Sequence, residues 1–289
     1  MYGLLQKITP LFNDQHHAIK SASMENKVFI IHGKQYTFKK ELGSGGFGYV
    51  YNARRHVDNK QVAIKVVTLA LKKAEKSYRN LESVLSEFRQ TRKLTEMSDY
   101  IVHMFDCGFS AQHGVAYLVM ELGQQDFGKY LLERPALTPV ERKTIWRQFV
   151  AIAITLQNNH IVHRDIKPQN LIVFPGVKVK LCDFGIATQA LERSERTGTY
   201  PYSAPEVTKP TPTTILTTKA DVWSWGAVLY RMTYLVRPDY VAPCYYPPEG
   251  QLTTSEAQLF DILRHTLVKN PEKRASVSWL SKHAYTKTD

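Results

Sequence analysis

The chain has 289 residues, 43% of them hydrophobic and 22% charged, which is typical of an ordinary globular protein and excludes a fibrous or disordered one. Its three cysteines, Cys107, Cys182 and Cys244, lie far apart without a CxxC pair, which argues against a disulfide framework or a zinc site and predicts a reducing compartment, the cytoplasm or the nucleus. Lys and Arg outnumber Asp and Glu by 38 to 26, but no long basic block or RNP-like motif supports nucleic-acid binding, and the excess charge favours acidic partners or is simply a solvated surface.

The N-terminal part of the chain is predicted to be a short extension followed by strands. Residues 1–27 show no sustained period, and they lack the basic region and long apolar core of a signal peptide. From Val28 to about Val67, short β-like runs alternate with turn signals. The segment 74–94 is expected to be a helix. Its apolar residues recur at helical spacing, at Leu81, Val84, Leu85, Phe88 and Leu94.

The character changes beyond Gly123, where long helical patterns dominate. The run "TPVERKTIWRQFVAIAITLQNNH" predicts a helix with Thr138 as its cap and Pro139 at its first position. Its apolar core "FVAIAITL" is too short to cross a bilayer. A β-rich part followed by a helical part predicts an α+β fold of two lobes with a cleft between them.

A glycine-rich stretch, "LGSGGFGYVY" at residues 42–51, predicts either a hairpin turn or a loop that covers phosphates. A Rossmann loop would open a helix and be followed by an acidic residue. Here the glycines lead into a strand, and the charged residue at the distance where a Rossmann loop would have its acidic residue is Lys65 in "VAIK". A glycine-rich loop between two strands, followed by a strand lysine, is the other arrangement that holds nucleotide phosphates.

Further motifs follow in the order which that arrangement requires. They are "HRDIKPQN" at 163–170, "DFG" at 183–185, "APE" at 204–206 and, before them, a helix that carries Glu87. On this set, residues 28–289 resemble the eukaryotic protein kinase family, with an N-lobe over about 28–122 and a C-lobe over about 123–289.

The resemblance implies a transfer of the γ-phosphate of ATP with Mg²⁺ as a cofactor. Asp165 would be the catalytic base, Lys167 would steady the γ-phosphate, and Lys65 would bind the α- and β-phosphates while paired with Glu87. Asn170 and Asp183 would bind the metal ion. The ATP-binding residues implied are Leu42, Gly43, Ser44, Gly45, Gly46, Phe47, Gly48, Tyr49, Val50, Ala63, Lys65, Met120, Glu121, Gly123 and Ile172. For each apolar member, plain core packing is the alternative.

Two features resemble serine/threonine kinases, namely Lys167 and "GTYPYSAPE", in which Thr199 would bond Asp165 and Lys167. The implied partner is a protein substrate, in an acidic context if the basic residues near the cleft contribute. Asp221 and Arg274 match structural positions of the family, and Arg274 is expected to pair with Glu206. A pseudokinase that serves as a scaffold is the alternative function, although Lys65, Asp165 and Asp183 are all retained.

Within the family, several stretches resemble the monopolar-spindle (TTK) group of dual-specificity kinases. They are "VFIIHGKQYTFKKELGSGG", "KSYRNLESVLSEFRQTRKL" and "VMELGQQDF". That likeness implies a mitotic role and tyrosine as a further acceptor. The interval from Lys65 to Glu87 is long, which leaves Glu82 as a competitor. Helical phase favours Glu87, because Phe88 and Leu94 then fall on neighbouring inward faces of the helix. Thr91 occupies a usually apolar position and is expected to loosen its helix.

The segment between "DFG" and "APE" offers Thr188, Ser194 and Thr197 as phosphorylation candidates, with Thr199 in the substrate-facing part. Glu195 stands where many kinases carry an activating phosphate. It would pair with Arg164 as a partial substitute, or it is a solvated loop residue.

If Glu195 substitutes for a phosphate, activity should survive dephosphorylation. We expect phosphatase-treated protein to retain activity comparable to that of untreated protein, because one carboxylate already supplies part of the charge. Comparing the two preparations in the same phosphotransfer assay tests this. Loss of all activity after phosphatase treatment would exclude the substitution.

Overall fold

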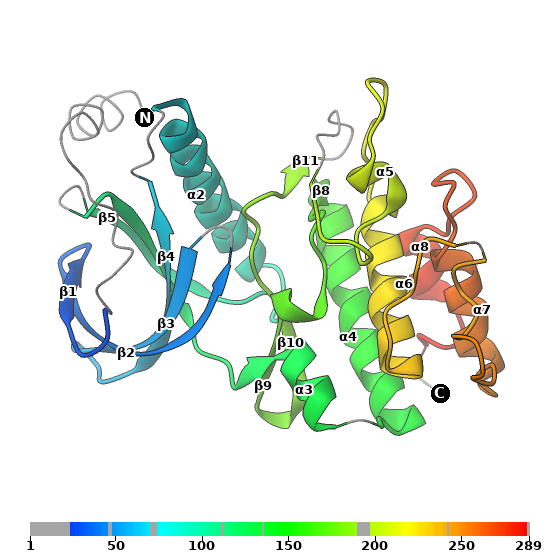
Figure 1. The fold of residues 1–289 in the computed structure, drawn as a ribbon. Coiled ribbons are helices and arrows are strands. Elements are labelled where there is room, and N and C mark those ends of the chain that lie inside the picture. The colour runs from blue at the N-terminus through cyan, green and yellow to red at the C-terminus, as the bar shows by residue number, and fades with distance from the viewer. Residues whose placement is uncertain are drawn as a thin grey trace. The chain divides into compact units, whose positions relative to one another are not determined.

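The computed structural model describes residues 24–45, 48–69, 74–110, 113–134, 136–189, 197–241 and 243–287, and the chain forms two compact units (Figure 1). The first comprises the described residues up to Lys93 together with Val102–Leu122. The second comprises Leu94–Ile101 and the described residues from Gly123 onward. Most of the expected N-terminal extension, up to residue 23, lies outside the described residues.

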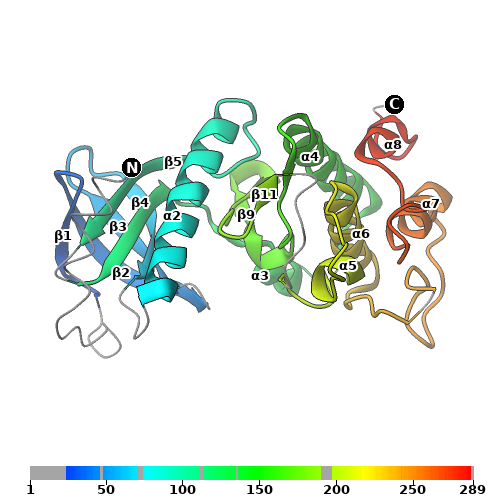
Figure 2. The same ribbon diagram turned by 90° about the horizontal axis from the view of Figure 1, so that it is seen from above.

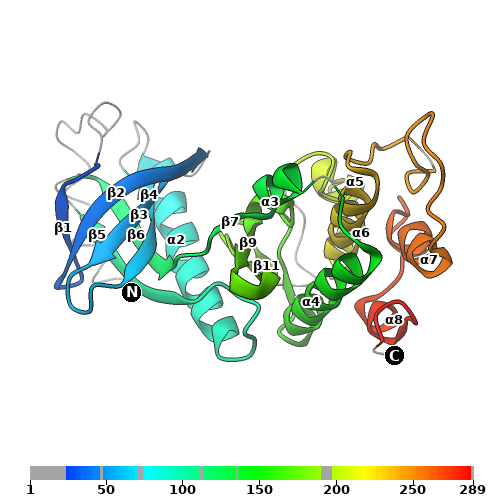
Figure 3. The same cartoon turned by 90° about the horizontal axis from the view of Figure 1, so that it is seen from below.

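The first unit is built on a six-stranded antiparallel sheet, as the alternation of β-like runs and turns predicts (Figure 3). Its strand order is β1-β2-β3-β4-β6-β5. The strands are β1 (Val28–Ile31), β2 (Lys34–Gly45), β3 (Gly48–Arg55), β4 (Gln61–Thr68), β5 (Met104–Ser110) and β6 (Val115–Glu121).

One face of this sheet is covered by the long helix α2 (Ala74–Thr95), which confirms the helix predicted there (Figure 2). Leu81 and Val84 are buried against Leu118 of β6, and Leu85 and Phe88 pack at the margin of the same cluster. The apolar stripe at helical spacing therefore faces the sheet, and it holds the polar residues between its members in a defined orientation.

The other face carries an aromatic cluster that includes Tyr36, Phe38 and Tyr117, with Phe29 of β1 against Phe38 at a ring distance of 4.7 Å. Strand β1 also approaches β5, where a Cβ added to Gly108 would lie 2.6 Å from the side chain of Ile31. Beside that contact, Asp106 of β5 accepts hydrogen bonds from His32 and Lys34, each at 2.8 Å. The turn between β1 and β2 is thereby tied to β5.

The second unit is mainly helical. Its helices are α3 (Phe127–Glu133), α4 (Pro139–Asn158), α5 (Pro205–Thr208), α6 (Lys219–Tyr234), α7 (Ala257–Thr266) and α8 (Val277–Lys282). Short strands and 3₁₀ turns complete it, namely β7 (Gln125–Asp126), β8 (Ile161–Val162), η2 (Pro168–Asn170), β9 (Leu171–Phe174), η3 (Pro175–Val177), β10 (Lys178–Leu181) and β11 (Thr188–Gln189). The strands pair in the order β10-β9-β7, with β11 on β8.

Helices α4 and α6 lie side by side at the centre of this unit, and α8 packs on α4 (Figure 1). The start of α4 is as predicted, because Thr138 and Glu141 form a reciprocal capping box and Pro139 occupies the first turn. Phe149 of α4 stacks on Trp225 of α6 at 5.2 Å. This aromatic contact joins the two central helices.

Two findings concern the cysteines and the length of the apolar helices. Cys107, Cys182 and Cys244 are free thiols. None of the described helices has both the length and the apolar character needed to span a membrane.

The pKa of the Asp106 carboxyl yields a prediction about the stability of the first unit. Burial opposes its ionisation, but the hydrogen bonds from Lys34 and His32 outweigh burial and lower its pKa. A lowered carboxyl pKa contributes stability above the ordinary value of about 3.9, and that stability is lost as the pH falls through the folded value.

We therefore expect Asp106→Asn to lower the free energy of unfolding by about 1 kcal/mol at neutral pH, and by progressively less below about pH 4. Urea unfolding at a series of pH values measures this. Asp99→Asn, which removes a carboxylate that is 88% exposed, is the control and should cause little change. A loss for Asp106→Asn that stays constant down to the lowest pH would contradict the assignment.

Candidate active site

A buried ion pair joins the central strand of the first unit to its helix. The Lys65 Nζ of β4 donates to both carboxylate oxygens of Glu87 on α2, at 3.0 and 2.9 Å. Lys65 is 8% exposed and Glu87 is 3% exposed. Glu82, the competing candidate, is exposed. The expected pairing with Glu87 is therefore confirmed.

The same helix buries a polar group one turn further on. Thr91 is 2% exposed, and its hydroxyl has no hydrogen-bond partner among the described residues. A buried hydroxyl without a partner costs about 1–3 kcal/mol. Thr91 therefore lowers the stability of the packing that holds Glu87 toward Lys65.

The glycine-rich stretch spans the end of β2 and the start of β3, so its described glycines lie where two paired strands meet, as expected. Gly43 pairs with Val50 and Ser44 with Tyr49, while Gly46 and Phe47 fall outside the described residues. Gly48 has a φ of 134°, and a Cβ there would meet the carbonyl oxygen of Val66 at 1.9 Å. Only glycine fits at this position.

The apolar candidates of the first unit share one face of the sheet with Lys65. Val50 lies opposite Lys65 in the β3–β4 ladder, and Ala63 lies opposite Met120 in the β4–β6 ladder. Residues that pair, and residues two apart on one strand, point to the same face. Leu42 is exposed at 38%, which suits a residue that meets a ligand better than a core residue.

Glu121, the next candidate along β6, uses its backbone inside the unit. Its N–H donates to the carbonyl oxygen of His103 at 2.9 Å, and its carboxylate accepts from the His103 N–H at 2.6 Å. In the second unit, Gly123 and Ile172 lie together, since a Cβ on Gly123 would come within 2.3 Å of the Ile172 side chain.

The second unit brings three polar side chains to the carboxylate of Asp165. The Lys167 Nζ donates to Asp165 Oδ2 at 2.6 Å, and the Thr199 hydroxyl donates to Asp165 Oδ1 at 2.7 Å. Lys167 also donates to the Thr199 hydroxyl at 2.8 Å. The expected contacts of Thr199 with both residues are confirmed.

Asn170 completes this group from the other side. Its Nδ2 donates to the backbone oxygen of Asp165 at 2.8 Å and to Asp165 Oδ2 at 3.1 Å. Because the amide nitrogen is committed to Asp165, the amide oxygen is turned away from it. Asn170 thus offers a hard oxygen donor at a fixed orientation.

Asp183 is brought near Asn170 by the β9–β10 hairpin. Leu171 pairs with Leu181, and the Cys182 N–H donates to the backbone oxygen of Asn170 at 2.9 Å. Asp183 follows directly and has a φ of 66°, a sparsely populated conformation for a residue with a side chain.

This pair of donors suits Mg²⁺, which binds through one or two protein oxygens together with substrate phosphates. The described residues contain no cluster of three or more His, Cys, Asp or Glu side chains that would bind a metal ion without a substrate. The amide oxygen of Asn170 and the carboxylate of Asp183 are of the oxygen type that Mg²⁺ prefers.

Asp221 of α6 holds the loop that carries Asp165 in place. Asp221 accepts the backbone N–H groups of His163 and Arg164, at 2.8 and 3.0 Å. Burial raises the pKa of the Asp221 carboxyl, an effect opposed by these two N–H groups and the neighbouring positive charge. The carboxylate is an anchor for the loop and does not reach the reacting atoms.

His163 and Ser203 position the site and were not among the predicted site residues. His163 Nδ1 accepts the Asp165 N–H at 3.3 Å, so its proton lies on Nε2, which contacts the Cys182 carbonyl at 3.1 Å. The Ser203 hydroxyl accepts from the Thr199 N–H at 2.8 Å and donates to the Arg164 carbonyl at 3.1 Å. His163 lies in "HRDIKPQN" and Ser203 lies in "GTYPYSAPE", so membership of these motifs was the sequence feature that could have identified them.

The phosphorylation candidates differ in their surroundings. Thr188 is buried and pairs with Val162 in the β8–β11 ladder. Thr197 has a buried hydroxyl that lacks a partner among the described residues. Ser194 and Glu195 fall outside the described residues, so the proposed pairing of Glu195 with Arg164 stays a prediction.

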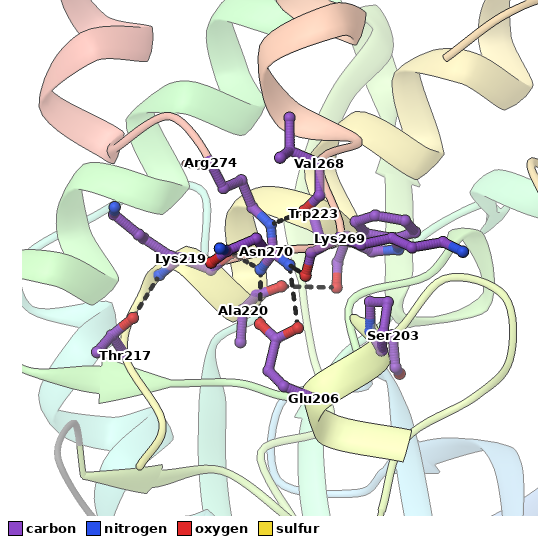
Figure 4. A network of polar contacts seen from close by, with 12 residues as sticks. Ser203, Glu206, Thr217, Lys219, Ala220, Trp223, Val268, Lys269, Asn270 and Arg274 are labelled. Atoms are coloured by element: carbon purple, nitrogen blue, oxygen red, sulfur yellow. Dashed lines mark hydrogen bonds and ion pairs between the residues drawn. The ribbon is translucent and has the colours of Figure 1, made fainter. Parts of the chain in front are cut away.

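The segment after Thr199 is anchored by a second ion pair, at the centre of Figure 4. Arg274 donates to both oxygens of Glu206, at 2.6 and 3.0 Å, as predicted from the sequence. The same guanidinium donates to the backbone oxygens of Val268, Lys219 and Lys269. Arg274 is 2% exposed, so all these acceptors depend on one buried cation.

Removing this cation should be costly for stability. We expect Arg274→Met to lower the free energy of unfolding by about 3 kcal/mol or more, because Glu206 would remain without its partner. Urea unfolding measures the change. Arg264→Met is the control, since Arg264 pairs with Asp261 at a side-chain exposure of 54% and should cost less than about 1 kcal/mol. Equal losses in the two variants would contradict the anchoring role.

Comparisons with known proteins agree with this geometry. Residues 36–286 match the family described as "Protein kinase domain". The chain is 32% identical over 287 residues to "Dual specificity protein kinase Ttk" of Danio rerio, covering 92% of the chain and 28% of that protein. It is 31% identical over 302 residues to "Dual specificity protein kinase TTK" of Mus musculus, covering 96% and 34%. It is 27% identical over 301 residues to "Probable serine/threonine-protein kinase mps1" of Dictyostelium discoideum, covering 95% and 30%.

The resemblance to the TTK group is thereby confirmed. The chain spans only 28–34% of the length of these three relatives.

Proposed function

Because the chain belongs to the protein kinase family, we propose that it transfers the γ-phosphate of ATP to serine and threonine hydroxyls of proteins. The observation that carries the proposal is the Asp165 carboxylate, which is held between Lys167, Thr199 and Asn170. A carboxylate in this setting accepts a proton from an incoming hydroxyl without changing its own position.

In the proposed reaction, the acceptor oxygen forms a bond to the γ-phosphorus while the bond between that phosphorus and the β,γ-bridging oxygen breaks. The acceptor proton passes to Asp165, and ADP leaves with the bridging oxygen. Lys167 is proposed to stabilise the negative charge on the transferred group, since its ammonium nitrogen is held 2.6 Å from the carboxylate that would receive the acceptor proton.

The nucleotide is proposed to bind with its phosphates at Lys65 and under the β2–β3 hairpin. The ion pair with Glu87 holds the Lys65 ammonium in place, so it is oriented before the phosphates arrive. The adenine is proposed to contact the apolar face that carries Val50, Ala63 and Met120, together with Leu42, Glu121, Gly123 and Ile172.

Asn170 and Asp183 would hold Mg²⁺ through their oxygen atoms. When bound, the ion neutralises phosphate charge and keeps the β- and γ-phosphates in one orientation. The orientation of the Asn170 amide supports this assignment, because its nitrogen is already committed to Asp165.

The names of the relatives from Danio rerio and Mus musculus include "dual specificity", and this extends the proposal to tyrosine as a second acceptor. The free cysteines support a reducing compartment, the cytoplasm or the nucleus. A nucleotide-binding scaffold without phosphotransfer is the alternative function.

The test is incorporation of label from [γ-³²P]ATP and Mg²⁺ into peptides that contain Ser, Thr or Tyr. We expect Asp165→Asn to lower the rate by roughly 10²-fold or more, because the proton acceptor is lost. Asp58→Asn, a change of the same kind in an exposed turn, should leave the rate unchanged.

Binding of a fluorescent ATP analogue shows whether each variant still has a nucleotide site. Equal incorporation by Asp165→Asn and the unaltered protein would reject the role of Asp165. Nucleotide binding by the unaltered protein without any incorporation would favour the scaffold.

A further inference from the structure

Two arginines at the end of α6 lie beside the loop that carries Thr199. Arg231 is in the last turn of the helix, and Arg237 follows the helix end by three residues. Arg231 is half-buried and Arg237 is exposed. Neither has a role in the proposed catalytic group, which consists of Asp165, Lys167 and Asn170.

The chain that follows α6 packs against residues 199–203. The Tyr240 ring contacts the rings of Tyr200 at 4.7 Å and Trp223 at 5.5 Å, and its hydroxyl donates to the backbone oxygen of Ser203. Trp223 of α6 donates to the Pro201 carbonyl at 3.4 Å. Arg237 lies three residues before Tyr240, so these contacts keep it close to this loop.

The pKa of Tyr202, in the middle of the loop, is affected by both arginines. Burial raises the pKa of its phenol, and the positive charges of Arg231 and Arg237 oppose that rise. The charges of both arginines therefore act on one buried side chain of the loop. This observation agrees with the packing of Tyr240 and Trp223 on the same segment.

The two cations have no carboxylate partner within the described parts of the chain. No ion pair joins Arg231 or Arg237 to a described Asp or Glu. The nearest acidic residue in sequence, Asp239, accepts the backbone N–H of Val241 at 2.8 Å and so closes its own turn. Glu206 of the adjacent segment is engaged by Arg274.

This cationic pair is also close to the acceptor position. Thr199, three residues before Tyr202, donates to Asp165 Oδ1, and Ser203 joins the same loop to the Arg164 carbonyl. A peptide whose hydroxyl lies at Asp165 would thus pass within a few residues of Arg231 and Arg237.

We propose that Arg231 and Arg237 bind a phosphorylated side chain of the protein substrate, a few residues from the acceptor hydroxyl. The protein then acts on substrates that an earlier phosphorylation reaction has already modified. Two guanidinium groups match a phosphate better than a single carboxylate, because a phosphate carries about −2 charge and three acceptor oxygens. This inference rests on the proposed function.

The test uses one acceptor peptide in versions that carry Ser, phosphoserine or Glu at each of the three positions on either side of the acceptor. We expect phosphoserine at one of these positions to raise kcat/KM by roughly tenfold or more over Ser, with Glu giving a smaller increase. The preference should weaken with added salt.

Arg231→Gln and Arg237→Gln should each reduce the ratio of kcat/KM for the phosphorylated and unphosphorylated peptides, and the double variant should bring it close to one. Arg264→Gln, which alters an arginine on α7, should leave the ratio unchanged. Because a ratio is compared within each variant, a partial loss of folded protein does not affect it.

Binding gives a second readout that does not depend on turnover. Fluorescence anisotropy of the labelled phosphopeptide with the Asp165→Asn protein should show tighter binding than for the Ser peptide, and the double arginine change should remove the difference. Phosphorylation of all peptides at equal kcat/KM would overturn this inference alone. No phosphorylation of any peptide would instead count against the proposed function. A Glu peptide as good as the phosphopeptide would overturn the preference for phosphate.

Discussion

The second unit depends on one buried carboxylate, Asp221, which accepts the backbone N–H groups of His163 and Arg164. These two residues directly precede Asp165, so the anchor sets the position of the Asp165 carboxylate without touching it. A buried carboxylate is costly unless hydrogen bonds compensate it, and the raised pKa of Asp221 reflects that cost. The buried carboxylate of Asp221 on α6 needs hydrogen-bond donors, and the loop supplies two of them. The loop is therefore held in one position. Arg164 has a φ of 69°, a conformation that persists only where surrounding contacts impose it.

A chain of hydrogen bonds extends from this anchor to the substrate-facing segment. Asp165 accepts from Thr199, the Thr199 N–H donates to Ser203, and the Ser203 hydroxyl returns to the Arg164 carbonyl. Three residues after Ser203, Glu206 is bound by Arg274. The loop that carries Asp165 and the loop that carries Thr199 are thus fixed relative to each other by hydrogen bonds, one of them to the Asp165 carboxylate, and to the helical core by buried charges. A change far from the reacting atoms, such as the loss of Arg274, would reach Asp165 along this route.

The first unit follows the same principle with a different pair. Lys65 and Glu87 are both buried, and a buried ion pair contributes little net stability but is costly to break. Its value here is orientation, since the ammonium group is held in place by a helix. The Thr91 hydroxyl, one turn along α2, has no hydrogen-bond partner in the part of the chain that the structure describes, and it weakens the same packing. The ion pair of Glu87 stabilises the position of α2, and the buried hydroxyl of Thr91 on the same helix destabilises it. The difference between these two effects determines how firmly Lys65 is positioned.

The sequence alone determined the features that depend on local pattern. The alternating strands, the helix at 74–94, the cap of α4 at Thr138, the glycine-rich stretch before a strand and the order of the motifs were all readable from spacing and residue type. The partners of charged groups were only partly readable. Helical phase favoured Glu87 over Glu82, and family likeness indicated Arg274 with Glu206. The tertiary structure alone decided that Asp106 closes the turn of β1 and β2, that Ser203 joins two loops, and that Tyr240 packs on the loop at residues 199–203. Those contacts join residues far apart in the chain or on separate loops, and periodicity carries no information about which distant segments fold against each other.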